Sequence, residues 1–249
     1  MSSSRISSEP QGPVVAGLLL AAGGGRRLGG RPKALLRHHG RPLVEYAVRV
    51  LREGGCGPVH VVLGASADRV RREADLSGCV VSVNPEWEEG MGSSLRVGLA
   101  SLTPPASPPA SGPTSTPGTP GPTGPAGSPG SPGSPGSPGS PGSPGSFGPV
   151  DAALVLLVDQ PGIGAEAVAR VRAAHRSRTS LVAAAYEGRR GHPVLFGADR
   201  WAAITESAVG DQGARAYLRT HADAVTLVEC GDVAEAYDID TPDDLHRLR

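Results

Sequence analysis

The chain reads VVAGLLLAAGGGRRLGGRPK over residues 14–33. The first seven of these residues are almost wholly apolar, which is typical of a strand buried on both faces of a parallel sheet. A glycine-rich loop follows, and its main-chain N–H groups can approach phosphates closely because glycine has no side chain. Arg27 and Lys33 place positive charge beside those groups. The stretch therefore predicts a strand followed by a phosphate-binding loop.

Lys33 is the only lysine in the chain, although Lys and Arg together number 24. A compact ammonium group and a planar guanidinium group differ in how they contact anions, so a single retained lysine indicates a site where the point charge matters. The alternative is a glycine-rich turn with a solvated lysine.

Two common phosphate-binding motifs do not fit this loop. The P-loop needs a lysine followed by Ser or Thr after its last glycine, but Arg31 and Pro32 follow Gly30. The dinucleotide fingerprint that starts at Gly23 needs a small residue where Leu28 lies. The sequence thus argues against a P-loop enzyme and an NAD site, and any magnesium ion must be held by carboxylates elsewhere.

Candidate carboxylates follow an apolar run over residues 152–158. Asp159 comes directly after this run, at the strand end where open α/β sheets bind ligands. Asp238 and Asp240 precede a short final helix. Magnesium prefers one or two carboxylates together with substrate phosphates. We therefore predict Asp159 and Asp240 as Mg²⁺ ligands, with Asp238 as a neighbour.

The composition argues against several classes of partner. The formal net charge is zero and long basic runs are lacking, which disfavours nucleic acid and anionic membranes. No segment approaches the ~18 apolar residues of a membrane helix. Cys56, Cys79 and Cys230 are widely spaced and form no CxxC pattern, so we expect reduced thiols in a cytoplasmic protein.

Residues 103–149 have a different composition, rich in Pro, Gly, Ser and Thr. Glycine occurs at every third position from 118 to 148, and Ser-Pro-Gly repeats six times between 128 and 145. This is formally a collagen pattern, but so short a run of Ser-Pro triplets favours a disordered insertion that the protein can lose without losing activity. The expected organisation is a flexible tail over 1–13 and one domain made of 14–102 and 150–249.

The rest of the chain alternates between strand and helix patterns. Strands are expected at 14–20, 58–63, 79–83, 152–158, 180–186, 193–196 and 225–229. Helices are expected at 42–53, 66–74, 92–102, 164–175, 199–207, 213–220 and 242–248. This alternation predicts a Rossmann-like α/β fold, with a mostly parallel sheet and helices on both faces. Trp87 and Trp201 are expected to be packing residues.

Six motifs in a fixed order carry a resemblance to a known family. They are LAAG through Lys33, NPEWEEGMGSSLRVG over 84–98, VDQP over 158–161, GHP over 191–193, GDQGAR over 210–215 and DIDTP over 238–242. With them the chain resembles the molybdopterin-type nucleotidyltransferases, and most of all the molybdenum-cofactor cytidylyltransferases. It departs from the family pattern in the loop, where Gly29 and Lys33 are one residue further apart than usual; Gly30 is interpreted as the extra residue.

The resemblance implies a single nucleotidyltransferase domain that transfers CMP from CTP to the phosphate of molybdopterin, with Mg²⁺ as cofactor and pyrophosphate as product. The motif Leu-Ala-Ala-Gly favours CTP, because guanylyltransferases tend to have Leu-Ala-Gly-Gly. Catalytic roles fall to Lys33, Arg27 and Asp159. The implied nucleotide-binding residues are Leu20, Ala21, Ala22, Gly23, Gly25, Lys33, Gly64, Asn84, Ser93 and Ser94. The implied acceptor-binding residues are His192, Asp211 and Arg215.

Other functions stay open at this stage. One is a guanylyltransferase, or a sugar-phosphate or phospholactate nucleotidyltransferase, on the same fold. Another is a non-catalytic protein that binds nucleotide and delivers the cofactor to a recipient molybdoenzyme or its chaperone. Release of pyrophosphate from CTP and acceptor distinguishes the enzyme from the delivery protein.

Overall fold

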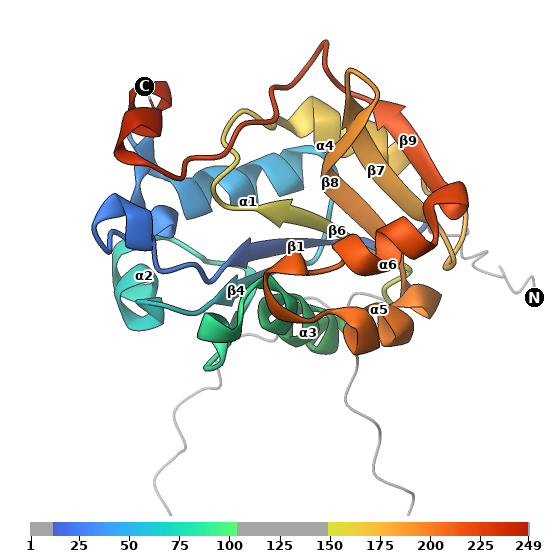
Figure 1. Cartoon of the computed structure of the whole chain (residues 1–249), viewed down its shortest axis with the longest axis horizontal. Coiled ribbons are helices and arrows are strands. Elements are labelled where there is room, and N and C mark those ends of the chain that lie inside the picture. Colours follow the sequence, from blue (N-terminus) through green and yellow to red (C-terminus); the bar gives the residue numbers. More distant parts are fainter. Residues whose placement is uncertain (1–11, 104–148, 249) are drawn as a thin grey trace, which may run out of the picture. The chain divides into compact units, whose positions relative to one another are not determined.

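The computed structural model describes residues 12–103 and 149–248, and Figure 1 shows them as a sheet with helices on both faces. These residues belong to one compact unit. The predictions for the tail over 1–13 and for the repeat over 103–149 lie almost entirely outside the described residues. Within the described ranges, no helix is long and apolar enough to cross a membrane.

The main sheet of the described residues has seven strands in the order β5-β4-β1-β6-β8-β7-β9. Adjacent strands are parallel except that β8 runs antiparallel to both β6 and β7. This confirms the mostly parallel sheet expected from the sequence. The strands are β1 Val15–Ala21, β4 Val59–Leu63, β5 Cys79–Val83, β6 Ala152–Leu157, β7 Leu181–Tyr186, β8 Arg189–Gly197 and β9 Val225–Glu229; β2 Arg37–His38 and β3 Arg41–Pro42 form a separate hairpin.

The helices bury the sheet from both sides (Figure 1). Strand β1 is buried along its whole length because its side chains alternate between two cores. Leu19 packs with the residues of α1, α2 and α4, whereas Leu18 packs with those of α3, α5 and α6. The helices are α1 Leu43–Glu53, α2 Ala67–Glu73, α3 Met91–Leu102, α4 Ala165–Ala173, α5 Trp201–Ser207 and α6 Arg215–Thr220.

Two elements differ from the sequence prediction. Strand β8 begins at Arg189 rather than at 193, because a tight turn at Glu187 and Gly188, with φ of 52° and 74°, pairs its polar start with the end of β7. The final helix is a 3-10 helix over Pro242–Arg247 rather than an α-helix over 242–248. The other predicted elements agree with the structure to within two residues at each end.

The strand order creates a crevice between β1 and β6. From β1 the chain continues to β4 and β5 on one side, and then returns to β6 on the other side of β1. The connections that leave β1 and β6 therefore diverge, and the space beyond their carboxyl ends is where open α/β sheets bind ligands. The glycine-rich loop and Asp159 both lie at this edge.

Candidate active site

The loop after β1 is a compact turn whose shape depends on glycine. Gly25 has φ of 59°, and a Cβ atom there would lie 1.9 Å from the carbonyl oxygen of Arg31. The N–H groups of Leu28 and Gly30 both donate to the carbonyl oxygen of Gly25, at 2.9 and 3.1 Å. Leu28 is buried and anchors the loop to the domain. The loop then passes through Gly29, with φ of 70°, on its way to Lys33.

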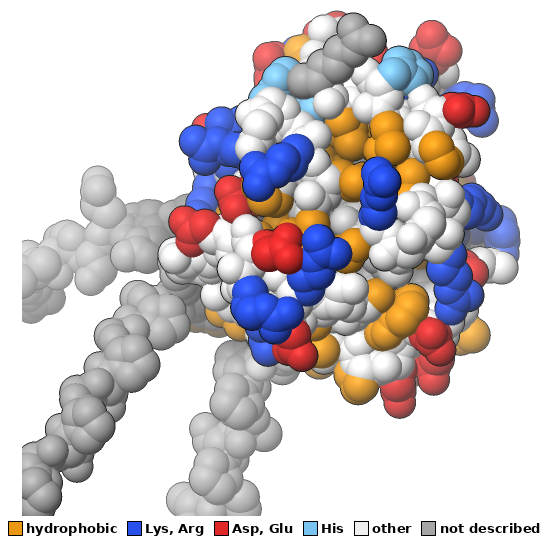
Figure 2. Space-filling model, turned by 90° about the vertical axis from the view of Figure 1, so that its left-hand side faces the viewer, with side chains coloured by type: hydrophobic (Ala, Val, Ile, Leu, Met, Phe, Trp, Pro, Cys, Tyr) orange, Lys and Arg blue, Asp and Glu red, His pale blue; other side chains and the backbone are white. Residues whose placement is uncertain are grey.

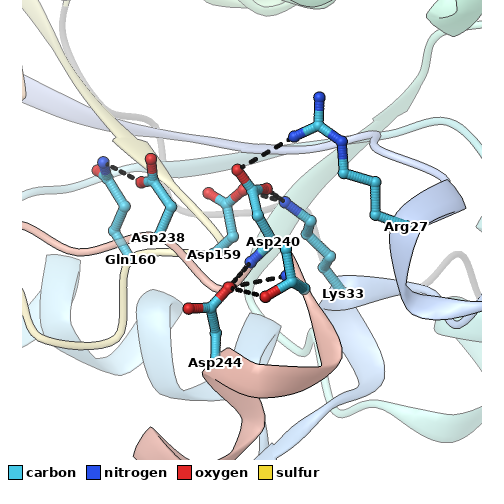
Figure 3. A network of polar contacts seen from close by, with 8 residues as sticks. Arg27, Lys33, Asp159, Gln160, Asp238, Asp240 and Asp244 are labelled. Carbon is cyan, nitrogen blue, oxygen red and sulfur yellow. Dashed lines mark hydrogen bonds and ion pairs between the residues drawn. The ribbon is translucent and has the colours of Figure 1, made fainter.

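Lys33 connects the two carboxylates that the sequence predicts as metal ligands (Figure 3). Its Nζ atom lies 2.7 Å from Oδ2 of Asp159 and also donates a hydrogen bond to Oδ1 of Asp240. Arg27 approaches the same cluster, with 3.8 Å between its guanidinium and Oδ2 of Asp240. The lysine and Asp159 side chains are 14% and 20% exposed, whereas that of Arg27 is largely exposed.

The charges of this cluster depend on one another. Burial by itself lowers the pKa of Lys33, but the charges and hydrogen bonds of Asp159 and Asp240 outweigh it and raise that pKa above its usual value. Burial raises the pKa of Asp159, and the ammonium group of Lys33 opposes the increase. The ammonium group of Lys33 therefore favours the ionised form of the buried carboxylate, which is the form that can bind a metal ion.

Asp240 and Asp238 occupy different environments (Figure 3). Asp238 accepts a hydrogen bond of 2.7 Å from Nε2 of Gln160 and makes none with Lys33. The backbone at Asp240 is fixed by Asp244, whose Oδ2 accepts the N–H groups of Asp240 and Thr241 at 3.1 and 2.8 Å. This arrangement directs the side chain of Asp240 toward Lys33.

The residues present fit a divalent metal ion shared with substrate. Within residues 12–103 and 149–248, no group of three or more His, Cys, Asp or Glu side chains could hold a metal by itself. Asp159 and Asp240 nevertheless reach one common cationic nitrogen, so both can reach one metal ion near it. Two carboxylates that leave several positions to phosphate and water match the coordination that Mg²⁺ takes in nucleotide sites.

A cavity of about 400 Å³ opens beside this cluster. Figure 2 views the molecule from the side toward which β1 and β6 point in Figure 1. On this face, basic and acidic side chains are interspersed around apolar patches. The predicted residues that line the cavity are Leu20, Ala22, Gly23, Gly25, Arg27, Lys33, Ser94, Asp159 and Asp240. Besides Asp211, the lining residues outside the set of predicted site residues are Gly24, Arg26, Trp87, Glu88, Gly90, Met91, Leu157 and Val158. Four of them, from Trp87 to Met91, belong to the 84–98 motif.

Four predicted nucleotide-binding residues support the wall rather than line it. Ala21 is buried, and a Cβ atom at Gly64 would lie 2.5 Å from the Cβ atom of Trp87. Trp87 is thus a packing residue, as predicted, and a lining residue as well. Asn84 is buried, and its Nδ2 donates to Oγ of Ser93 and Ser94 at 2.8 and 3.0 Å. These contacts tie the loop after β5 to the start of α3.

A second cavity of about 520 Å³ adjoins the first, since Leu20 and Met91 line both. Of the three predicted acceptor-binding residues, His192 and Arg215 line this second cavity, whereas Asp211 lines the first cavity. Burial, with the nearby charges of Arg215 and Arg190, lowers the pKa of His192 to about 4. His192 is therefore uncharged at neutral pH.

A family model described as the MobA-like NTP transferase domain matches residues 17–225. The chain belongs to this family. The match confirms the nucleotidyltransferase resemblance that the motifs carry, together with the α/β fold that it implies. It identifies the chain as an enzyme of the transferase type. The glycine-rich loop and Asp159 lie within the matched residues, whereas Asp240 lies beyond them.

Three similar proteins have related sequences or structures. The MobA-like chain is 35% identical over 243 residues to nicotine blue oxidoreductase from Paenarthrobacter nicotinovorans, which covers 95% of this chain and 97% of that protein. The crystal structure of an Rv0371c homologue from Mycobacterium sp. strain JC1 has 26% identity, covers 94% of both chains and gives a TM-score of 0.67. A manganese complex of Rv0371c from Mycobacterium tuberculosis has 22% identity, covers 94% of this chain and 97% of that one, and gives a TM-score of 0.62; this level of identity shows the shared fold alone.

Proposed function

We propose that this MobA-like enzyme transfers CMP from CTP to a phosphorylated acceptor of the molybdopterin type, with Mg²⁺ as cofactor. The observation that carries the proposal is the contact of Lys33 with both Asp159 and Asp240, which line the first cavity together with the glycine-rich loop. A cation and two carboxylates at one point are the groups that phosphoryl chemistry needs for charge stabilisation.

Each group of residues has its own role in the proposed reaction. The N–H groups of the loop and Arg27 bind the β- and γ-phosphates of the nucleotide, and Lys33 stabilises negative charge that builds up on the α-phosphate. Asp159 and Asp240 would hold the metal ion, which when bound would supply positive charge to the phosphates of the nucleotide. An oxygen of the acceptor phosphate forms a bond to the α-phosphorus while the bond from that phosphorus to the pyrophosphate oxygen breaks. A phosphate acceptor is already ionised at neutral pH, so the reaction needs no general base.

Support for CTP as the nucleotide comes from the Leu-Ala-Ala-Gly motif. Leu20 and Ala22 of this motif line the first cavity, where they can contact the nucleotide. The experiment that tests the proposal measures pyrophosphate release with each of the four NTPs, with Mg²⁺ or Mn²⁺, and with molybdopterin or sugar 1-phosphates as acceptor. We expect release with CTP and molybdopterin. Equal or greater release with GTP or with a sugar 1-phosphate would favour one of the alternative transferases.

A second candidate function is an oxidation–reduction reaction, for which NAD(P)H is one electron donor to test. It is favoured by the 35% identity to nicotine blue oxidoreductase along nearly the whole of both chains. The loop does not supply the usual dinucleotide fingerprint, because Leu28 is buried at the position where that fingerprint has a small residue. Loss of NAD(P)H absorbance on addition of an aromatic electron acceptor, without pyrophosphate release from any NTP, would establish this function instead.

A further inference from the structure

The cations that line the first cavity already have carboxylate partners. Among the described lining residues they are Arg26, Arg27 and Lys33. The guanidinium of Arg26 lies 3.5 Å from Oε1 of Glu88, and that of Arg27 lies 3.8 Å from Oδ2 of Asp240. Lys33 differs from both arginines because it contacts two carboxylates at once. Carboxylates of the protein therefore lie beside the cations that the phosphates of a nucleotide would need.

The contact between Lys33 and Asp159 is the most shielded of these ion pairs. The side chains of Arg26, Glu88 and Arg27 are largely exposed, so water weakens the attraction to their partners. Those of Lys33 and Asp159 are mostly buried, where the attraction between opposite charges is stronger. A ligand that separates Lys33 from its carboxylates must therefore offer new partners to both.

Lys33 and a metal ion need the same carboxylates (Figure 3). The Nζ atom of Lys33 lies 2.7 Å from Oδ2 of Asp159 and donates a hydrogen bond to Oδ1 of Asp240. The other oxygen of Asp240 faces Arg27. A metal ion that binds both carboxylates must therefore replace a cation at Asp240. A metal ion and an ammonium group that share these two carboxylates also repel each other at short range.

We infer that Lys33 occupies the place of the metal ion in the free protein, and that metal binding releases its ammonium group toward the phosphates of the nucleotide. The inference deepens the proposed function, on which the assignment of Asp159 and Asp240 as metal ligands rests. The flexible four-carbon stem of lysine lets the ammonium group change partners without a movement of the backbone. Before the metal ion binds, the lysine compensates the charge of the two carboxylates. Afterwards it is free to contact an anion.

The first test measures the affinity for Mn²⁺ by electron paramagnetic resonance, in the absence of any nucleotide. Lys33→Met removes the competing ammonium group but keeps an unbranched side chain, so it should bind Mn²⁺ at least about tenfold more tightly than the wild type. Arg26→Gln is the matched control, because Arg26 lines the same cavity and contacts Glu88 instead of the proposed ligands. It removes the same charge, and its affinity for Mn²⁺ should stay within about threefold of wild type. The double variant Lys33→Met/Asp159→Asn should lose the gain, which locates the ion at the carboxylates.

The second test uses the wild-type chain and does not depend on the folding of a variant. Because Lys33 is the only lysine, protein labelled with ¹³C-lysine gives the side-chain signals of this one residue in a nuclear magnetic resonance spectrum. Titration with Mg²⁺ should shift and narrow the signal of the carbon next to Nζ as the ammonium group leaves its two carboxylates. The change should saturate over the range of Mg²⁺ concentration that displaces Mn²⁺ from the protein.

Three outcomes would overturn the inference. These are a Mn²⁺ affinity in folded Lys33→Met that equals or falls below that of the wild type, an equal gain in Arg26→Gln, and a lysine signal that does not change at Mg²⁺ concentrations that displace Mn²⁺. Circular dichroism checks the fold of the variants, and if Lys33→Met does not fold, the titration of the wild type decides. The proposed function fails separately. If the metal and lysine results hold but no NTP gives pyrophosphate, the exchange of cations is correct and the nucleotidyl transfer is wrong.

Discussion

Lys33 holds two carboxylates with one ammonium group, and this explains why the chain retains a single lysine among its many arginines. A guanidinium group is planar and needs its partners in that plane, whereas an ammonium group donates in three directions from a compact centre. Asp159 and Asp240 come from loops 81 residues apart in the sequence, and the compact ammonium group donates to both.

Replacement of Lys33 should damage turnover more than folding. Lys33→Ala is expected to lower kcat by about 10²–10³-fold, comparable to the loss of one oxyanion-hole donor, and Lys33→Arg should recover little of it. Binding of Mn²⁺ without nucleotide should persist in Lys33→Ala, because this variant keeps both of the carboxylates that we propose as metal ligands. Steady-state kinetics and a Mn²⁺ titration check this. If Lys33→Ala keeps a turnover close to that of the wild type, Lys33 has no catalytic role.

The three acidic residues should differ in their effect on the metal. Asp159→Asn and Asp240→Asn are expected to abolish metal-dependent turnover, whereas nucleotide binding without metal should survive. Asp238→Asn is the matched control, because Asp238 bonds Gln160 and not Lys33, and it should keep most of the activity. Mn²⁺ affinity, measured by electron paramagnetic resonance, should follow the same order. A greater loss in Asp238→Asn than in Asp240→Asn would make Asp238 the ligand.

Among the structural elements, the loop between β1 and Lys33 has a conformation that depends on particular glycines. Gly25 and Gly29 both have positive φ, but only Gly25 has a neighbour in the space of a side chain. Gly25→Ala would place its Cβ atom 1.9 Å from the carbonyl oxygen of Arg31, so the turn must open. Gly29→Ala has open space and should cost only the ~1 kcal/mol of a left-handed non-glycine residue.

The two glycine variants should therefore differ in their affinity for nucleotide. Gly25→Ala is expected to weaken NTP binding by about tenfold or more, since the loop N–H groups lose their common orientation. Gly29→Ala should bind NTP with an affinity within about threefold of wild type. The substitution makes the loop conformation less stable but displaces no neighbouring atoms. Calorimetric titration with CTP and Mg²⁺ measures both. Equal affinities in the two variants would show that this turn does not bind the phosphates.

The predicted elements agree with the structure where local pattern determines them. Strands β1 and β6 were predictable because a strand covered by helices on both faces is apolar at nearly every position. The polar start of β8 was missed because Arg189 and Arg190 join the sheet only by pairing with the end of β7. The pair Glu187-Gly188 was the available signal, since a two-residue turn with positive φ is typical of a hairpin.

At the scale of the whole molecule, His192 links stability to pH. Its pKa in the folded protein is about 4, below the ~6.5 of an unperturbed histidine, so the unfolded chain binds the proton first as the pH falls. This contribution to stability is complete above about pH 6.5 and is lost toward pH 4, by up to about 3 kcal/mol.

Replacement of His192 should reduce that dependence on pH. In His192→Gln, the free energy of unfolding by urea should fall less between pH 7 and pH 4.5 than in the wild type, and the other acid-sensitive groups account for the remaining fall. His246→Gln, at an exposed histidine of the last 3-10 helix, controls for the loss of imidazole charge in general. A pH dependence identical to wild type in His192→Gln would place His192 in a solvated environment.

The sequence by itself determined the fold class, the family and the residues proposed for the Lys33 cluster, because these depend on hydrophobic period, glycine geometry and residue type along short stretches. Only the tertiary structure decided which of these residues meet. It separated Asp240 from Asp238 and moved Asp211 to the first cavity. It also brought Arg190 and Arg219, which no motif marks, to the lining of the second cavity. The physical reason is that a pocket forms between chain segments distant in sequence, and their charges and volumes act on one another only after the sheet has brought them together.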